Sequence, residues 1–205
     1  MTDDYPADRL DELIVRHPKL FHGKHPRVYS QCPAGWFDLV DKLCTDLEAI
    51  LGDATGAFAI EQIKQKWAGL RFYWSIKGTA EPLYADLIGF HPRDEEDLSE
   101  QGEPGYRLSI EEKIWGTRIS MTPSTELGNA VTVRIESAET ESEATCEWCG
   151  APGQLWIAGR GGPGYHYTAC AAHKGEHAKS HAEWYAEMER RRDERARKPE
   201  TGNSS

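Results

Sequence analysis

Apolar side chains recur every three or four residues in two N-terminal segments, which is the spacing of one helix face. The first segment covers residues 6–17 and ends before Pro18, so it predicts a short helix. The second runs from Gly35 to Gly52, where glycine suits the end of a helix. Its apolar positions are Trp36, Phe37, Leu39, Val40, Leu43, Cys44, Leu47, Ile50 and Leu51. This wide stripe predicts a long amphipathic helix packed on the core.

The pattern changes to strict alternation in the next segment, which is typical of a half-buried strand. Between 70 and 77, four apolar residues alternate with four polar or amphipathic ones. A second run covers 58–66, and the three residues that separate the runs end in Gly69. Glycine between two strand-like runs favours a tight turn. The two runs therefore predict a β-hairpin.

One face of this predicted hairpin combines basic and aromatic residues, namely Lys64, Lys66, Arg71 and Tyr73. This composition suits a surface for single-stranded nucleic acid or for an acidic partner. The simpler interpretation is an exposed strand face whose lysines discourage pairing at the sheet edge. Both interpretations expose the face to solvent, so the four residues are candidate binding residues.

The middle of the chain is rich in glycine, proline and acidic residues. Residues 78–104 predict an irregular loop with at most one helical turn, near 83–88. Two short alternating runs follow at 106–110 and 117–121, and they predict two further strands.

Two later segments favour helices. The apolar residues of 124–143 fit a strand or a helix, but Ser124 follows a proline and suits an N-cap, so a helix is preferred. The run 170–198 has no proline before Pro199 and is rich in Ala, Glu, Lys and Arg. It predicts a long helix whose last turns are unpacked.

The strongest chemical signal is a pair of ligand motifs in the C-terminal third. Cys146 and Cys149 form C-x2-C, and after a spacer of twenty residues Cys170 and His173 form C-x2-H. Two residues between ligands let a tight turn aim both at one ion, and Gly150 suits such a turn. Three thiolates and one imidazole are ligands that zinc prefers, and four of them close its coordination sphere. The spacing therefore predicts a structural zinc site.

The spacer between the motifs holds two strand-like runs around a glycine-rich tip at 159–164. A knuckle, a hairpin and the helix predicted from Cys170 together indicate a treble-clef-like zinc module, with the second ligand pair on the first helical turn. His177 and His181 would then lie on the same helical face as His173 and are alternative ligands.

Two further cysteines stand apart from these motifs. Cys44 lies on the apolar stripe and is expected to be a small buried hydrophobe. Cys32 has no charged neighbour in the sequence that would lower the pKa of its thiol, so reactivity is not expected of it.

The chain has 205 residues, of which 39% are hydrophobic, so it has room for one medium domain or a domain with a small module. Its mean hydropathy is −0.67 and no apolar run approaches a membrane span. The N-terminus is acidic, unlike a secretory signal. We therefore expect a cytoplasmic protein that does not enter membranes.

The formal net charge is −10 at pH 7, and residues 79–145 carry it, with 15 acidic and 5 basic side chains. Charge of this sign repels phosphate backbones, which disfavours general nucleic-acid binding by this segment. The acidic side chains either keep an exposed insertion solvated or form an acidic surface that binds a basic partner.

Together these elements predict an α+β fold built on a helix and a β-hairpin. We expect a helix and hairpin core at 1–77, an acidic insertion at 78–125, and a zinc module with the long C-terminal helix at 126–205. The three parts are expected to pack as one composite unit.

The chain resembles a family of uncharacterised proteins from bacterial genomes and their phages, which pair a Gly-Trp-Phe helix with a Gly-Leu-Arg-Phe-Tyr hairpin and end in a Cys-x-x-Cys-Gly and Cys-x-x-His module. The matching stretches are 35–39, 64–73 and 146–150 with Cys170 and His173. The resemblance covers about 18–77 and 130–175. Ala68 replaces a second glycine, and the acidic insertion departs from the pattern. The resemblance implies one composite unit and carries over no activity.

No nucleotide-binding loop, dinucleotide fingerprint, zinc-peptidase or serine-hydrolase motif is present. We therefore expect a zinc-stabilised binding or regulatory module, more than an enzyme. It would serve as a phage-encoded or phage-related accessory or inhibitor protein whose acidic surface engages a protein, including a nucleic-acid-binding protein. The alternative is a nucleic-acid-binding or treble-clef nuclease-like protein, with Arg160 on a phosphate and His166 as general base.

Overall fold

The computed structural model describes residues 5–78, 82–88, 105–158 and 164–197. In these ranges the protein has an α+β fold with small antiparallel sheets, as the sequence predicted. Its helices are α1 (Leu10–Arg16), α2 (Pro18–Phe21), α3 (Phe37–Leu51), α4 (Glu126–Ser142) and α5 (His181–Arg197), with 3₁₀ turns at Ala34–Trp36 and Gly52–Ala57. Its strands are β1 (Phe58–Lys66), β2 (Gly69–Ile76), β3 (Leu83–Ile88), β4 (Tyr106–Lys113), β5 (Gly116–Pro123), β6 (Gln154–Ala158) and β7 (Tyr165–Ala169). None of the described helices is both long and apolar enough to cross a membrane.

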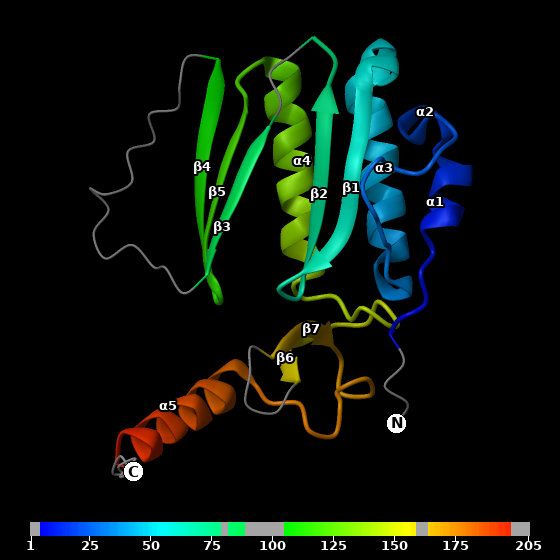
Figure 1. Cartoon of the computed structure of the whole chain (residues 1–205). Helices are drawn as coiled ribbons and strands as arrows, with labels where there is room; N and C mark the ends of the chain where they lie inside the picture. The colour runs from blue at the N-terminus through cyan, green and yellow to red at the C-terminus, as the bar shows by residue number, and fades with distance from the viewer. Residues whose placement is uncertain (1–4, 79–81, 89–104, 159–163, 198–205) are drawn as a thin grey trace, which may run out of the picture.

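The main body has a layer of strands and a layer of helices (Figure 1). The β1–β2 hairpin lies beside a three-stranded sheet of order β3-β5-β4, and α3 and α4 pack together behind the strands. The buried core comes mainly from α3, the hairpin and α4. Seven apolar residues of α3 are buried, which confirms the predicted stripe. The β6–β7 hairpin and α5 lie beyond one end of this body.

The predicted hairpin is present, and its turn has an unusual backbone. Lys66 pairs with Gly69, so only Trp67 and Ala68 form the loop. Both have positive φ angles, 55° and 63°. Two-residue loops require such angles and usually place asparagine or glycine there. A side chain in this conformation costs free energy, and strain of this kind gathers at functional sites.

The segment at 83–88 was expected to form at most a helical turn, and this is wrong. It forms β3, which pairs with β5 so that Asp86 lies opposite Arg118. The Nζ of Lys66 also forms an ion pair with Asp86 at 2.6 Å. These long-range contacts decide the conformation, whereas the local sequence has the glycines and prolines of a loop. The rest of the predicted loop, 79–81 and 89–104, lies outside the described residues.

The helix α4 confirms the preferred interpretation of 124–143, although its N-cap is Thr125 and not Ser124. The Oγ1 of Thr125 accepts a hydrogen bond from the backbone N–H of Gly128 at 3.0 Å. Two side chains of α4 then accept backbone N–H groups of β2, which leaves those groups satisfied without another strand. Ser142 Oγ accepts from Leu70 at 2.8 Å, and Glu139 Oε1 accepts from Phe72 at 2.9 Å.

The C-terminal helix begins at His181, so the prediction of a helix from Cys170 is wrong. A capping box starts it: Ser180 Oγ accepts from the N–H of Glu183, and the Glu183 carboxylate accepts from the N–H of Ser180. The residues between Cys170 and Ser180 form turns instead. The second ligand pair therefore lies on a turn, and His177 and His181 do not share a helical face with His173.

Candidate metal centre

Four side chains meet at one point in the C-terminal part of the chain, and they are the four that the sequence predicted. The ligand atoms of Cys146, Cys149, Cys170 and His173 all lie within 4.8 Å of one another. The Sγ atoms of Cys149 and Cys170 are 3.8 Å apart. The Nδ1 of His173 lies 3.5 Å from the sulfur of Cys146 and 3.3 Å from that of Cys170. The set can hold a metal ion.

Two tight turns aim these ligands. In the first, the N–H of Gly150 donates to the carbonyl of Cys146 at 2.9 Å, and Gly150 has a φ of 73°, as the knuckle required. In the second, the backbone N–H groups of His173 and Lys174 both donate to the carbonyl of Cys170. The β6–β7 hairpin joins the turns, which confirms the predicted hairpin; its tip, including Arg160, lies outside the described residues.

Aromatic rings support the ligand histidine from outside. The ring of Trp148 stacks on the His173 ring with centroids 6.0 Å apart, and Tyr167 meets the edge of Trp148. The hydroxyl of Tyr167 accepts from the N–H of Gly175 at 3.1 Å, which fixes the turn after the second ligand pair. Residues 145–180, with the ligands and this aromatic support, are called the metal module below.

The cysteine thiols differ in how readily they ionise. Loss of solvent raises the pKa of Cys170, but hydrogen bonds from the ring and the backbone of His173 lower it to about 6. Its thiolate, the form that binds metals, is therefore available at neutral pH. Burial raises the pKa of Cys146, so that thiol ionises when a cation coordinates it.

Hydrogen bonds to backbone carbonyls attach the metal module to the helix and hairpin core. The N–H of Gly35 donates to the carbonyl of Glu147, and the indole Nε1 of Trp36 donates to the carbonyl of Thr145, both at 2.8 Å. On the other side, Thr168 Oγ1 donates to the carbonyl of Ala68 at 2.8 Å. These bonds place the metal cluster beside the start of α3 and the hairpin turn.

Glu147, between two ligands, is the main side chain at this junction. Its Oε1 accepts from the N–H of Thr168 at 2.8 Å and from the amide of Gln65 at 3.3 Å. Burial raises the pKa of Glu147 to about 7. The carboxylate therefore ties the knuckle both to β7 and to β1.

Gly35 allows the closest approach at this junction, so replacing Gly35 with alanine is expected to push the metal module off the core. An added Cβ would lie 2.0 Å from the carbonyl oxygen of Cys146 and 2.7 Å from the N–H nitrogen of Cys149. Backbone atoms cannot rotate away, so we expect a loss of about 3 kcal/mol, the upper part of the overpacking range. Chemical denaturation of the metal-loaded protein measures it.

Gly56→Ala is the matched control, because a Cβ there meets nothing within 4 Å and its φ is not in the positive range. It is expected to leave stability nearly unchanged. Equal stability of the Gly35 and Gly56 variants would contradict the close junction.

The candidate binding residues of the hairpin do not form one exposed face. Arg71 was expected in solvent, and this is wrong: it is buried, with 1% of its surface exposed. Lys66 is engaged by Asp86, and the Nζ of Lys64 lies 5.1 Å from the centre of the Tyr73 ring. The role of these residues in binding stays a prediction.

Among the residues that the structure describes, the other histidines and cysteines are not members of the metal cluster. His177 is exposed, and His166 lies against Trp67, with ring centroids 5.1 Å apart. Burial lowers the pKa of His166. Cys32 and Cys44 are fully buried, and burial raises the pKa of both thiols. This agrees with the predictions that Cys44 is a small buried hydrophobe and that Cys32 is not reactive.

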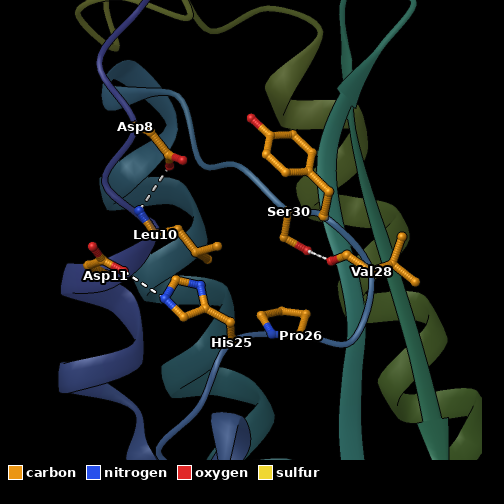
Figure 2. Close-up of a pocket in the computed structure, with 8 residues that line it drawn as sticks. Asp8, Leu10, Asp11, His25, Pro26, Val28 and Ser30 are labelled. Carbon is orange, nitrogen blue, oxygen red and sulfur yellow. Dashed lines mark hydrogen bonds and ion pairs between the residues drawn. The ribbon is translucent and has the colours of Figure 1, made fainter.

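Sequence reasoning missed a hollow of about 390 Å³ beside α1, shown in Figure 2. Asp8 Oδ1 accepts the N–H of Leu10, the first residue of α1, at 3.0 Å there, and His25 pairs with Asp11 at 3.0 Å. Val28 and Tyr29 also line it and are 50% and 78% exposed. The available signal was a pair of large apolar residues in an otherwise polar segment.

Comparison with known protein families, with curated proteins and with solved structures found no match. A function for this chain is therefore proposed from its own sequence and geometry.

Proposed function

We propose that this protein is a zinc-stabilised protein-binding module, in which one structural zinc ion holds the metal module on the helix and hairpin core. The cluster geometry carries the proposal. A tetrahedron with Zn–S of about 2.3 Å and Zn–N of about 2.0 Å has S–S edges of about 3.8 Å and S–N edges of about 3.5 Å. The sulfurs of Cys149 and Cys170 are 3.8 Å apart, two of the three sulfur to nitrogen distances are 3.5 Å and 3.3 Å, and all four ligand atoms lie within 4.8 Å of one another.

Three thiolates and one imidazole are soft ligands, which suit zinc better than magnesium or calcium. Four protein ligands close the sphere and leave no position for a substrate, which supports a structural role. Among the described residues, these four side chains are the one group of three or more Cys, His, Asp or Glu residues that lie close enough together to hold a metal ion. A second, catalytic metal, which a treble-clef nuclease would need, has no ligand set in these parts of the chain.

The hollow of Figure 2 supports a protein as the partner. Tyr29 exposes its side chain, while its backbone carbonyl is held by the amide of Gln62 at 2.7 Å. An exposed tyrosine whose backbone is held next to a concave surface is typical of a protein interface. The net charge of −10 favours a partner with a basic surface. In this role the module acts as a regulatory or accessory protein, and the phage-related inhibitor is one form of it.

The nucleic-acid alternative receives less support from the geometry. Arg71 is buried and Lys66 is paired, so two of the basic groups that it needs are not free for phosphates. Tight, salt-sensitive binding of single-stranded DNA or RNA by the purified protein would favour this alternative.

Metal analysis tests the proposal that the protein holds a structural zinc ion. The purified protein is expected to hold one zinc ion per chain, and a chelator is expected to remove it with loss of structure in the metal module. Zinc far below one per chain, or a module that keeps its structure after chelation, contradicts a structural zinc.

Two variants test the proposal that the surface around Tyr29 binds a protein. Tyr29→Ser is expected to abolish co-purification of a protein that the wild type retains at low salt, whereas Val133→Ser, on α4 and 57% exposed, is expected to keep it. Loss of an aromatic anchor costs at least about 2 kcal/mol, or about thirtyfold in affinity. If both variants retain the same protein, or if the wild type retains none, the surface around Tyr29 is not the binding surface.

A further inference from the structure

The three-stranded sheet β3-β5-β4 turns polar side chains toward the helix α4. In β5, Arg118, Ser120 and Thr122 alternate on this side, and each is at most 6% exposed. Arg118 pairs there with Glu139 of α4, and the guanidinium of Arg107 on β4 pairs with the same helix. Successive side chains of a strand point to opposite faces of its sheet. The residues between these polar ones therefore lie on the face that points away from α4.

This second face is apolar and partly open to solvent. Residues directly opposite one another on paired strands share a face. Two apolar rows cross the three strands in this way, and they consist of Leu83, Met121 and Leu108 and of Ala85, Ile119 and Ile110. These six residues are called the open sheet face below. Leu83 is 58% exposed, Ala85 is also exposed, and the other four are partly exposed.

The sheet therefore has the reverse of the usual pattern. An antiparallel sheet with one solvated side commonly packs its apolar side on the core and exposes its polar side to water. Here α3 and α4 lie behind the strands, and no described helix or strand lies in front of this sheet (Figure 1). None of the six residues belongs to a buried apolar cluster. Contiguous apolar patches that stay open on a soluble protein often mark interaction sites.

The charge of the open sheet face indicates which partner fits it. The face contains no charged residue, although 28% of the chain is charged and its net charge is −10. Glu112 lies on the same side of β4, one row beyond Ile110. A basic partner would find no charge to pair with at the centre of this face, whereas a second copy of the face brings no like charges together there. Two sheets of the same twist also pack face to face with interdigitated side chains.

We propose that two copies of this chain associate weakly through their open sheet faces. A two-fold axis relates the copies, so that each contributes the same patch. Three strands about 4.8 Å apart and up to eight residues long span roughly 400 Å² of sheet. This area is small beside the roughly 800 Å² that each partner of a standard interface contributes, so the dimer belongs to the weak class. Salt strengthens it, because salt screens the repulsion between two chains of net charge −10.

The test is sedimentation equilibrium of the full-length, zinc-loaded protein at about 5 to about 500 μM, the range in which a weak interface forms. We expect the mass to rise from one chain of 23.1 kDa toward two, and to rise further at about 0.5 M salt than at about 0.15 M. The methyl NMR signals of Ile119 and Met121 are expected to shift with protein concentration, while the signal of Ile135, buried on α4, stays in place. A protein that remains monomeric throughout would overturn the proposal and leave the face to another occupant, such as residues 89–104 or a different protein.

Glutamate variants locate the interface. Met121→Glu, on the central strand, is expected to weaken the dimer at least about thirtyfold, because it buries a carboxylate from each copy. Leu83→Glu is expected to weaken it at least about tenfold for the same reason, and it decides the matter if Met121→Glu fails to fold, since Leu83 is exposed in one copy. Val133→Glu is the control: it adds the same charge at a residue of α4 that is 57% exposed, against 58% for Leu83, and is expected to change nothing. A dimer undiminished by Leu83→Glu, or weakened equally by Val133→Glu, would reject this face.

Discussion

Replacing Cys149 with serine is expected to remove the metal from the protein and to unfold residues 146–185, while the helix and hairpin core stays folded. The binding free energy of a structural zinc, about 10–16 kcal/mol in small zinc modules, is also folding free energy. Apart from its hydrogen bonds to the helix and hairpin core, the module has little apolar packing to hold it, since its own buried apolar cluster consists of Cys146, Tyr167, Ala169 and Ala178. The larger core cluster contains none of these four residues. We therefore expect the core to stay folded when the ion is absent.

Metal analysis and hydrogen exchange measure this outcome. Zinc is expected to fall from one per chain to almost none, and exchange protection is expected to disappear in β6 and β7 but to remain in α3. His177→Ala is the control, because His177 is exposed, lies close to the second ligand pair and is not a member of the cluster. A Cys149→Ser protein with full zinc content and a protected β6–β7 hairpin would refute the metal assignment.

The metal centre was predictable because its information is local. Each ligand pair lies within four residues, and the turn that aims it needs only a short sequence with Gly150 in place. The stripe of α3 and the alternation of β2 were predictable for the same reason, since each period appears within one segment. Fold class and ligand set therefore followed from the sequence.

Features that depend on distant partners were not predictable. The β3 segment has the local composition of a loop, and it is a strand because β5 pairs with it. The alternation of β2 placed Arg71 on the polar face, but the β4–β5 turn brings Trp115 over that face and buries the guanidinium. The start of α5 is different: the Ser180 and Glu183 capping box is a local signal, and the continuous helix-forming composition from Cys170 concealed it.

A buried ion pair lies at the junction between the strands and α4, so replacing Arg118 with methionine is expected to destabilise the protein strongly. Arg118 of β5 forms this pair with Glu139 of α4, and both side chains are at least 94% buried. The Glu139 carboxylate also accepts the backbone N–H of Phe72 at 2.9 Å. Removing one partner leaves a buried charge without compensation, which costs about 3–5 kcal/mol. Chemical denaturation of the zinc-loaded protein measures this loss.

A second substitution separates the charge from the packing. In the double variant Arg118→Met with Glu139→Gln, both members of the pair are uncharged, the neighbouring buried Asp86 keeps its ion pair with Lys66, and the amide oxygen still accepts the N–H of Phe72. We expect its stability to return to within about 1 kcal/mol of the wild type, because uncharged side chains of similar volume often replace a buried pair without loss. Arg134→Met is the control on the same helix: Arg134 pairs with Asp46 at 2.7 Å, but Asp46 is 39% exposed, so its loss is expected to cost at most about 1 kcal/mol. A double variant as unstable as Arg118→Met alone would show that packing, and not an uncompensated charge, is what Arg118 contributes.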